Sequence, residues 1–393
     1  MYNIHEIRKD FPVLEKVIYL DNGATSQTPV PAVEAMCEYF YSYAANHGRG
    51  AHRLARETTN RYENARETVA DFLGIGAKNV VFTKNTTESI NIVAQGFGFT
   101  KGDHIITTLI EHHSNLLPWM KLRDIGVEVT IVSPGSTGIV SPESIEDAIQ
   151  DNTKFISVTH ISNVLGSIQD VGKMVAIAKK HGIAILIDAA QSAGHMELDI
   201  KKLGCDFLAA PGHKGLLGPQ GTGVLYMKQP ESVQPLFLGG GTVHSVTTQD
   251  YILDDFPSRF EAGTPNISGV IGLGRAVEYV KDLGVGNIEK HELSLARDAA
   301  QRLSEIDNVE VYGPKNRGSV VPFNVVGLNA HDVAMILDEV RTICVRSGHH
   351  CAIPSIGFLG VEGTVRATFG LYNTQDEVDA LVDMVGQIAT SLV

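Results

Sequence analysis

A lysine, an aspartate and a cysteine stand where each could take part in chemistry. Asp188 closes the apolar run AILID, Lys214 lies in the glycine-rich segment GHKGLLG, and Cys351 follows two histidines in VRSGHHCAIP. Lysine amines form Schiff bases with aldehydes, carboxylates bind cationic nitrogens, and thiolates act as nucleophiles or metal ligands. Taken singly, Asp188 could equally be a helix cap, Lys214 a solvated charge, and Cys351 a metal ligand or a buried thiol.

The spacing of Asp188 and Lys214 favours a ligand that both contact. They lie 26 residues apart, at the ends of successive predicted strands. Ligands of open parallel sheets bind at the carboxyl ends of the strands. Pyridoxal phosphate (PLP) would use both residues, because its aldehyde reacts with a lysine and its pyridinium nitrogen pairs with a carboxylate.

A phosphate could bind where the strand VVFT meets the next helix. Asn85 is a good N-cap with Glu88 three positions on, and the first turn carries Thr86 and Thr87. Hydroxyls and free N–H groups at a helix start can hold a phosphate. Plain helix capping explains the same pattern.

Three more polar residues follow predicted strands or occupy a turn. His112, after HIITT, could stack on a flat ring or shuttle a proton, or merely begin a helix. Asn163 comes after FISVTHI, and Thr264 lies in the turn of RFEAGTPN. No G-x-G-x-x-G motif follows a first strand, which disfavours a dinucleotide enzyme.

These residues need a sheet that brings strand ends together. From about residue 60 to 230, short apolar strands alternate with amphipathic helices, which indicates an α/β fold with a mostly parallel, seven-stranded sheet between helices. The predicted strands are 80–83, 104–108, 127–132, 155–161, 184–188, 206–210 and 223–227.

The pattern after about residue 280 predicts a smaller α+β domain. Strands are expected at 309–313, 320–326, 343–348 and 365–372, and helices at 331–340 and over the last twenty residues. Thr374 and Glu377 predict a capping box for the final helix, whose buried stripe is Val378, Leu381, Val385, Ile388 and Leu392. We therefore predict a large domain over 18–280 and a small one over 1–17 and 281–393.

Composition limits the partners. The net charge is −13, from 32 basic and 45 acidic side chains, which argues against nonspecific binding to nucleic acid or membranes. The N-terminus lacks the apolar region of a signal peptide, and the longest apolar runs are too short to cross a bilayer, so a cytoplasmic protein is expected. The four cysteines read as free thiols without a C-x-x-C pair, and no metal is expected.

In order along the chain, these motifs resemble the SufS-type (group II) cysteine desulfurases, PLP enzymes of fold type I in the class V aminotransferase family. The resemblance covers nearly the whole chain. Its motifs are YLDNGATSQTP, NHGRGAH, EHHSNLLPW, HISNVLG, DAAQ, GHK, RFEAGTPN, RSGHHCAIP and RATFGLYNT. It implies conversion of L-cysteine to L-alanine, with transfer of sulfur to an acceptor for iron–sulfur cluster assembly.

The resemblance also implies roles for the PLP contacts. Lys214 would bind the cofactor covalently and remove the substrate Cα proton, and Asp188 would pair with the pyridinium nitrogen. His112 would stack on the ring and transfer protons. The other implied cofactor contacts are Thr86, Thr87, Asn163, Gln191, His213 and, from across a homodimer interface, Thr264.

For the substrate, the resemblance implies that Arg366 clamps the carboxylate, with Asn163 and Arg346 close by. Cys351 would take the sulfur as a persulfide. His349, His350 and Arg346 are candidates to activate this thiol. Neighbouring residues on an extended segment point to opposite faces, so only some of them can face it.

Three positions depart from the family pattern. Pro211 stands where a serine hydroxyl is common, Asn85 replaces a usual glycine, and Gly48 replaces a histidine. The first puts one phosphate contact in doubt. Two other functions stay open: a selenocysteine lyase or related C–S lyase on the same fold, and a metal-binding or redox-sensing protein that uses Cys344 and residues 349–351.

Overall fold

The larger part of the molecule is built around a seven-stranded sheet. The computed structural model describes residues 2–391. The strand order is β2-β8-β7-β6-β5-β3-β4, and β8 alone runs antiparallel to the other six strands. This confirms the predicted mostly parallel sheet. Its strands are β2 (Val80–Thr83), β3 (His104–Thr108), β4 (Glu128–Val132), β5 (Thr153–Thr159), β6 (Ala184–Asp188), β7 (Phe207–Pro211) and β8 (Gly223–Met227).

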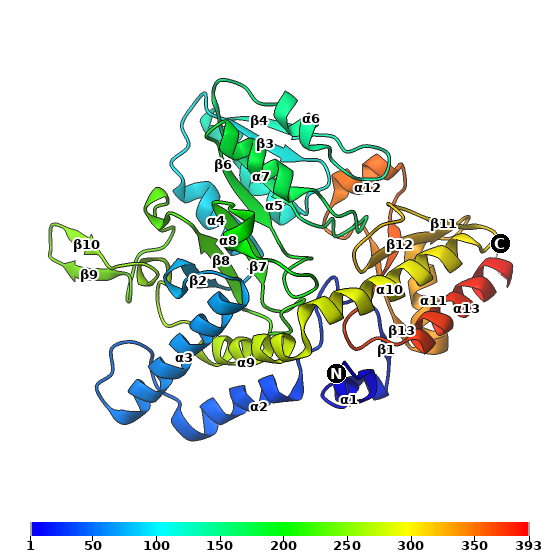
Figure 1. Cartoon of the computed structure of the whole chain (residues 1–393), viewed down its shortest axis with the longest axis horizontal. Helices are drawn as coiled ribbons and strands as arrows, with labels where there is room; N and C mark the ends of the chain where they lie inside the picture. The colour runs from blue at the N-terminus through cyan, green and yellow to red at the C-terminus, as the bar shows by residue number, and fades with distance from the viewer. Residues whose placement is uncertain (1, 392–393) are drawn as a thin grey trace.

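Both faces of this sheet are buried under helices (Figure 1). Successive residues of a strand point to opposite faces, so Ile105 packs in the core with Trp119 while Ile106 packs in the core with Tyr62. The α-helices of this part are α2 (Val30–Glu38), α3 (Arg53–Phe72), α4 (Thr86–Gly96), α5 (His113–Lys121), α6 (Pro142–Asp147), α7 (Val171–Lys180), α8 (Ile200–Leu203) and α9 (Ile267–Leu283).

The smaller part is an antiparallel sheet covered by helices. Its strand order is β11-β12-β15-β14, with β11 (Val309–Val311), β12 (Val320–Val325), β14 (Arg346–Gly348) and β15 (Thr364–Thr368). The helices here are α10 (Val285–Ser304), α11 (Ala330–Arg341), α12 (Ile353–Leu359) and α13 (Gln375–Ser391). Figure 1 shows α10 running from α9 into this part. The predicted α+β character is confirmed.

The last helix begins as its sequence predicts. Thr374 Oγ1 accepts from the Glu377 N–H at 3.4 Å, and Glu377 Oε2 accepts from the Thr374 N–H at 3.1 Å, which is a capping box. The predicted stripe residues are buried except for Leu392, which lies outside the described residues: Val378, Leu381, Val385 and Ile388.

The N-terminal segment joins the smaller part before the chain enters the large sheet. After α1 (Ile4–Arg8), strand β1 (Ile18–Tyr19) pairs in parallel with β13 (Ile343–Cys344). Leu20 packs in the same core as Phe323 and Val365. The proposed boundaries at 17/18 and 280/281 remain predictions.

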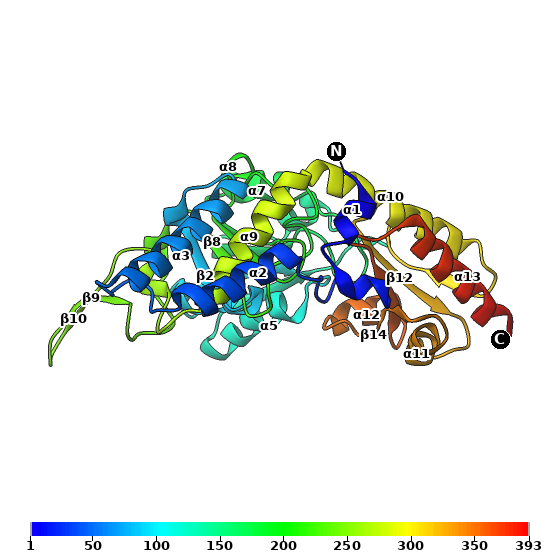
Figure 2. The ribbon, with the colours of Figure 1, turned by 90° about the horizontal axis from the view of Figure 1, so that it is seen from below.

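A hairpin extends away from the body of the molecule. Strands β9 (Val243–Val246) and β10 (Tyr251–Leu253) form it, and it projects at the end opposite the smaller part (Figure 2). Within residues 2–391, none of the helices has the length and apolar character needed to span a membrane.

Candidate active site

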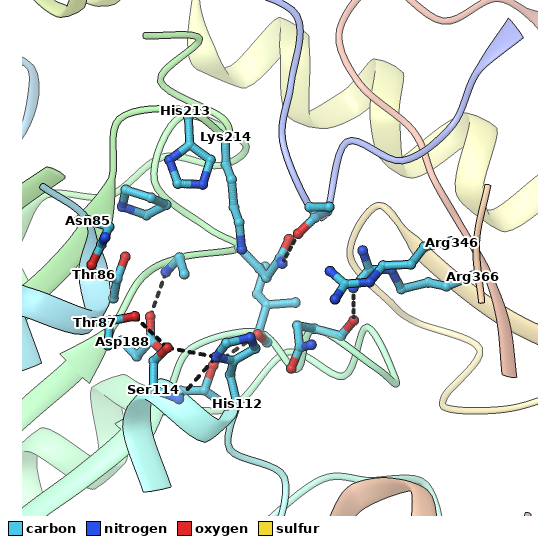
Figure 3. Close-up of a pocket in the computed structure, with 18 residues that line it drawn as sticks. Asn85, Thr86, Thr87, His112, Ser114, Asp188, His213, Lys214, Arg346 and Arg366 are labelled. Atoms are coloured by element: carbon cyan, nitrogen blue, oxygen red, sulfur yellow. Dashed lines mark hydrogen bonds between the residues drawn. The ribbon is translucent and has the colours of Figure 1, made fainter. Parts of the chain in front are cut away.

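A polar pocket lies where the carboxyl ends of the parallel strands meet the smaller part (Figure 3). It has an empty volume of about 700 Å³. Loops after β3, β5, β6 and β7, the start of α4 and two strands of the smaller sheet contribute side chains. The pocket includes ten of the predicted site residues: Thr86, Thr87, His112, Asn163, Asp188, Gln191, His213, Lys214, Arg346 and Arg366.

Asp188 and Lys214 form the reactive centre of this pocket. Asp188 is the last residue of β6, and its Oδ1 accepts from the Ala190 N–H at 2.9 Å. Burial raises the pKa of Asp188 to about 6. Burial, together with the guanidinium groups of Arg366 and Arg346, lowers the pKa of Lys214 to about 8. A cation placed against Asp188 would restore its ionised form, and a lysine of this kind supplies a neutral amine near physiological pH.

His112 caps helix α5 and presents the other edge of its ring to the pocket. Its Nδ1 accepts from the Ser114 backbone N–H at 3.1 Å, which leaves the proton of the neutral ring on Nε2. Burial and the nearby Lys214 lower the pKa of His112 to about 3. The ring is therefore neutral at physiological pH, and Nε2 is the atom that can donate a proton.

The first turn of α4 forms the anion-binding end of the pocket. Asn85 Oδ1 accepts from the Glu88 N–H at 3.0 Å, so the predicted N-cap is confirmed. The buried Thr86 hydroxyl and His213 Nδ1 have no hydrogen-bond partner within residues 2–391. Thr87 Oγ1 lies 2.7 Å from Ser114 Oγ. Buried polar atoms that lack hydrogen-bond partners at the start of a helix can bind a phosphate.

Two buried side-chain amides line the pocket, and the oxygen atom of each lacks a hydrogen-bond partner among the described residues. Asn163 Nδ2 donates to the His350 carbonyl at 2.8 Å, and Gln191 Nε2 donates to the Gly23 carbonyl at 2.9 Å. Asn163 Oδ1 and Gln191 Oε1 have no partner among the described residues. Buried polar atoms are rarely left unpaired, so both oxygens are available to a polar ligand.

Arg366 enters from the smaller sheet as a fully buried cation. Its Nη1 donates to the Asn163 carbonyl at 2.9 Å, and its Nη2 donates to Asp21 Oδ1 at 3.1 Å. Burial lowers the pKa of Arg366 to about 10, against the opposing effect of Asp21. It stays charged at neutral pH. Arg346 pairs with Arg366 across β14 and β15, so two cations face the same side of the pocket (Figure 3).

Cys351 lies in a groove beside this pocket. Its exposed Sγ is 3.4 Å from Arg346 Nη2, and Arg346 lines both spaces. The segment is a tight turn, because His350 and Cys351 have φ of 52° and 57°. The expectation of an extended segment is therefore wrong at these two residues. The Cys351 carbonyl accepts from the His113 N–H at 2.8 Å, which holds the turn against α5.

The three candidate partners of the thiol have different surroundings. His350 is buried, its Nε2 lies 2.8 Å from Thr364 Oγ1, and burial lowers its pKa to about 2. His349 is exposed. Within the part of the chain that the structure describes, only Arg346 makes a side-chain hydrogen bond to Sγ. Cys344 Sγ instead lies 3.9 Å from Asp338 Oδ1, and residues 2–391 contain no cluster of three metal-ligating side chains.

Thr264 lies outside this pocket. It is exposed and lines a different hollow with Phe237 and Leu238, while Glu261 anchors its turn through an ion pair with Arg66 at 2.7 Å. A role for Thr264 would therefore require a second copy of the chain. Pro211 lines the pocket without a hydroxyl, as its sequence predicts.

Sequence reasoning missed three residues that hold the site together. Asp21 pairs with Arg366, Ser114 joins Thr87 to His112, and Glu111 is buried below the loop that carries His112. Asp21 stands in YLDNGATS, and the other two stand in EHHSNLLPW. Both segments carry motifs of the family, but the sequence does not show which residues these three side chains contact.

The fold and this pocket belong to a known family. A family model described as aminotransferase class-V matches residues 18–381, and the chain belongs to that family. PLP is its cofactor. The residues of the pocket fit the three polar groups of PLP. The polar atoms at the start of α4 that lack partners among the described residues fit its phosphate, the Asp188 carboxylate fits its ring nitrogen, and the Lys214 amine fits its aldehyde.

Within the family, the similar proteins are cysteine desulfurases. A probable cysteine desulfurase from Methanothermobacter thermautotrophicus is 48% identical over 390 residues, which cover 98% of both chains. The apo structure of a cysteine desulfurase from Thermococcus onnurineus NA1 has a TM-score of 0.95 and 46% identity over 98% of both chains. A cysteine desulfurase from Escherichia coli, in an S-sulfonic acid form, has a TM-score of 0.93 and 35% identity over 100% of both chains. The predicted resemblance to cysteine desulfurases of the class V aminotransferase family is confirmed, and the SufS-type subgroup stays a prediction.

Proposed function

We propose that this enzyme is a PLP-dependent cysteine desulfurase that converts L-cysteine to L-alanine and takes the sulfur on Cys351. The observation that carries the proposal is the convergence of Lys214, Asp188 and Arg366 on one pocket, with Cys351 bound to a guanidinium that lines the same pocket. The first three residues suit an amino-acid substrate of PLP. Cys351 suits sulfur transfer rather than transamination.

The cofactor contacts follow from the polarity of the pocket. Thr86, Thr87 and His213 would hold the phosphate, and Asp188 would hold the ring nitrogen in its protonated form. His112 would cover one face of the ring, and Gln191 would use its free Oε1 as an acceptor. When bound, PLP withdraws electrons from the substrate Cα and so makes the Cα proton acidic.

The chain's own residues position the substrate and move its proton. Arg366, with Asn163 and Arg346 beside it, would bind the carboxylate of cysteine through charge-assisted hydrogen bonds. Lys214 Nζ would remove the Cα proton, which its lowered pKa permits near neutral pH. Lys214, which then carries that proton, would return it later in the turnover, while the neutral His112 ring donates a hydrogen bond through Nε2–H beside this path.

Sulfur transfer occurs at the thiolate of Cys351. Its Sγ attacks the substrate sulfur, so a sulfur–sulfur bond forms while the substrate Cβ–S bond breaks. The electron pair of the broken bond stays with carbon, which gains a proton to become the methyl group of alanine. The balance is L-cysteine plus the Cys351 thiol giving L-alanine plus a Cys351 persulfide.

The proposal includes partners that would complete the cycle. A homodimer would bring Thr264 of each chain to the phosphate end of the other site. An acceptor protein or iron–sulfur scaffold would remove sulfur from the exposed Cys351. We further propose that the enzyme acts in the cytoplasm.

The test is product analysis after L-cysteine is added to PLP-loaded protein. We expect alanine to form and mass spectrometry to find one additional sulfur atom on Cys351. Cys351→Ala should lose the persulfide while it keeps bound PLP, and Cys344→Ala, a matched thiol that contacts Asp338, should behave like wild type. Full cysteine turnover by Cys351→Ala would refute the sulfur-transfer step, and turnover of L-selenocysteine alone would favour a selenocysteine lyase.

A further inference from the structure

Glu111 is a fully buried carboxyl next to the proposed PLP site that takes no part in the proposed reaction steps. It lies between β3 and α5, directly before His112. Within residues 2–391 it makes no ion pair. Its oxygens instead accept from the Thr108 hydroxyl at 2.5 Å, the Thr159 N–H at 3.0 Å and Asn115 Nδ2 at 2.6 Å. A carboxyl that is buried without a cation favours its protonated form.

The hydrogen-bond network fixes where such a proton can lie. The Thr159 backbone N–H can only donate. Asn115 must also donate to Glu111, because its Oδ1 accepts from Trp119 Nε1 at 3.2 Å and from Ser157 Oγ at 2.6 Å, and an indole N–H has no acceptor capacity. Thr108 is different, since a hydroxyl both donates and accepts. The proton of a neutral Glu111 can therefore lie only between Oε1 and Thr108 Oγ1.

The same network places Glu111 beside Asp188. Thr159, whose N–H binds Glu111, is paired with Asp188 across β5 and β6. Two neighbouring buried carboxyls resist simultaneous ionisation. On the basis of the proposed cofactor site, we propose that Glu111 is a positioning residue that keeps a proton in its hydrogen bond to Thr108 and so leaves Asp188 as the ionised member of the pair.

This arrangement gives the ring-nitrogen end of the site a defined charge. Burial raises the pKa of Glu111 to about 8 against the lowering effect of its hydrogen bonds with Thr108, Asn115 and Thr159, and the nearby Asp188 adds to the rise. Among the elements packed around Glu111, Asp188 on β6 is the titratable group that acts on its carboxyl, and the neighbouring His112 is held neutral. As pH rises through this range, Glu111 loses its proton and a second negative charge appears beside Asp188.

The test is pH-difference infrared spectroscopy of the PLP-loaded protein. We expect the C=O band of a protonated carboxyl to disappear as pH rises through about 8, and to be missing in Glu111→Gln. Thr108 contacts both forms of Glu111, but its hydrogen bond to the ionised carboxylate is the stronger one, so Thr108→Val should move the midpoint upward by about one pH unit. Thr107→Val is the matched control, because Thr107 is a buried neighbour on β3 whose hydroxyl lacks a partner among the described residues.

Several results would overturn the inference. They are the absence of such a band in wild type, its persistence in Glu111→Gln, or equal midpoints in Thr108→Val and Thr107→Val. The threonine pair decides the matter even where Glu111→Gln does not fold. Failure to take up PLP would refute the proposed function instead, and the same titration on the cofactor-free protein would still test Glu111.

Discussion

Replacement of Arg366 by lysine separates the charge of this residue from its geometry. A guanidinium has five N–H donors in a planar fork, whereas an ammonium has three from one atom. In the structure the Asn163 carbonyl and Asp21 Oδ1 each take one donor. Nε remains buried without a partner among residues 2–391. Arg366 therefore keeps three donors for a substrate carboxylate, while a lysine that served the same two acceptors would keep one.

The expected cost follows from this count. Arg366→Lys loses one of the two charge-assisted hydrogen bonds that a carboxylate would accept, which is worth about 1.5–3 kcal/mol. That corresponds to a decrease in kcat/KM of roughly 10-fold to 150-fold. The loss should appear mainly in KM for L-cysteine, because the carboxylate is bound in the ground state and the transition state alike.

Steady-state alanine formation at varied L-cysteine concentration measures this effect, with bound PLP quantified in the same samples. Asp21→Asn is the control, because it removes the negative charge that pairs with Arg366 but keeps the guanidinium, and it should lose much less kcat/KM than Arg366→Lys. A kcat/KM of Arg366→Lys within about threefold of wild type would refute the carboxylate clamp. Equal losses in the two variants would indicate that Arg366 acts only by holding Asp21.

Three further predictions test the cofactor lysine and the packing around the site. Lys214→Ala should abolish alanine formation and the visible absorbance of the lysine–PLP bond; substantial turnover would contradict its assignment. In wild type, the rate at which the cofactor-free protein takes up PLP should rise with pH to about 8 and level off above it, because only the neutral amine reacts and burial lowers the Lys214 pKa to that value; a rate that keeps rising to pH 10 would refute this. Arg66→Ala leaves Glu261 buried without its cation and should lower the free energy of unfolding by about 3–5 kcal/mol. Arg61→Ala on the same helix breaks exposed pairs with Glu57 and Glu38 and should cost about 0–1 kcal/mol, as denaturant midpoints would show.

The fold was predictable because its signals are local. Each strand of the large sheet is a short apolar run bounded by turn residues, and all seven predictions overlap the observed strands. The ends of helices also have local signals. Gly74 adopts a φ of 72° just after α3, and Asn85 caps the start of α4. Tyr62, Ala65, Val69 and Phe72 recur at helical spacing and predict a helix over 60–73. The helix begins earlier, at Arg53, because His52 caps it through a ring nitrogen, which is not one of the usual capping groups.

The site was predictable only in part. The strand-end rule brings Asp188 and Lys214 together, because both lie at the same edge of one sheet. Arg366 reaches the pocket from a separate sheet, and its partner Asp21 lies 345 positions away in the chain. Hydrophobic periodicity carries no information about such a pair. The turn at His350 and Cys351 was hidden for a different reason, since positive φ is uncommon outside glycine and neither histidine nor cysteine requires it.

That turn places the proposed sulfur acceptor, Cys351, beside the cofactor pocket and not inside it. Two consecutive non-glycine residues at positive φ are costly and persist only where neighbouring structure holds them. Here Asn163 binds the His350 carbonyl, and the start of α5 binds the Cys351 carbonyl. Both hydrogen bonds come from segments that also line the pocket, so a movement of either segment would shift the Cys351 thiol. Arg346 completes this link, because it contacts Sγ and faces the pocket. The exposed thiol is therefore accessible to a second protein while its position is set by the residues that would bind the substrate.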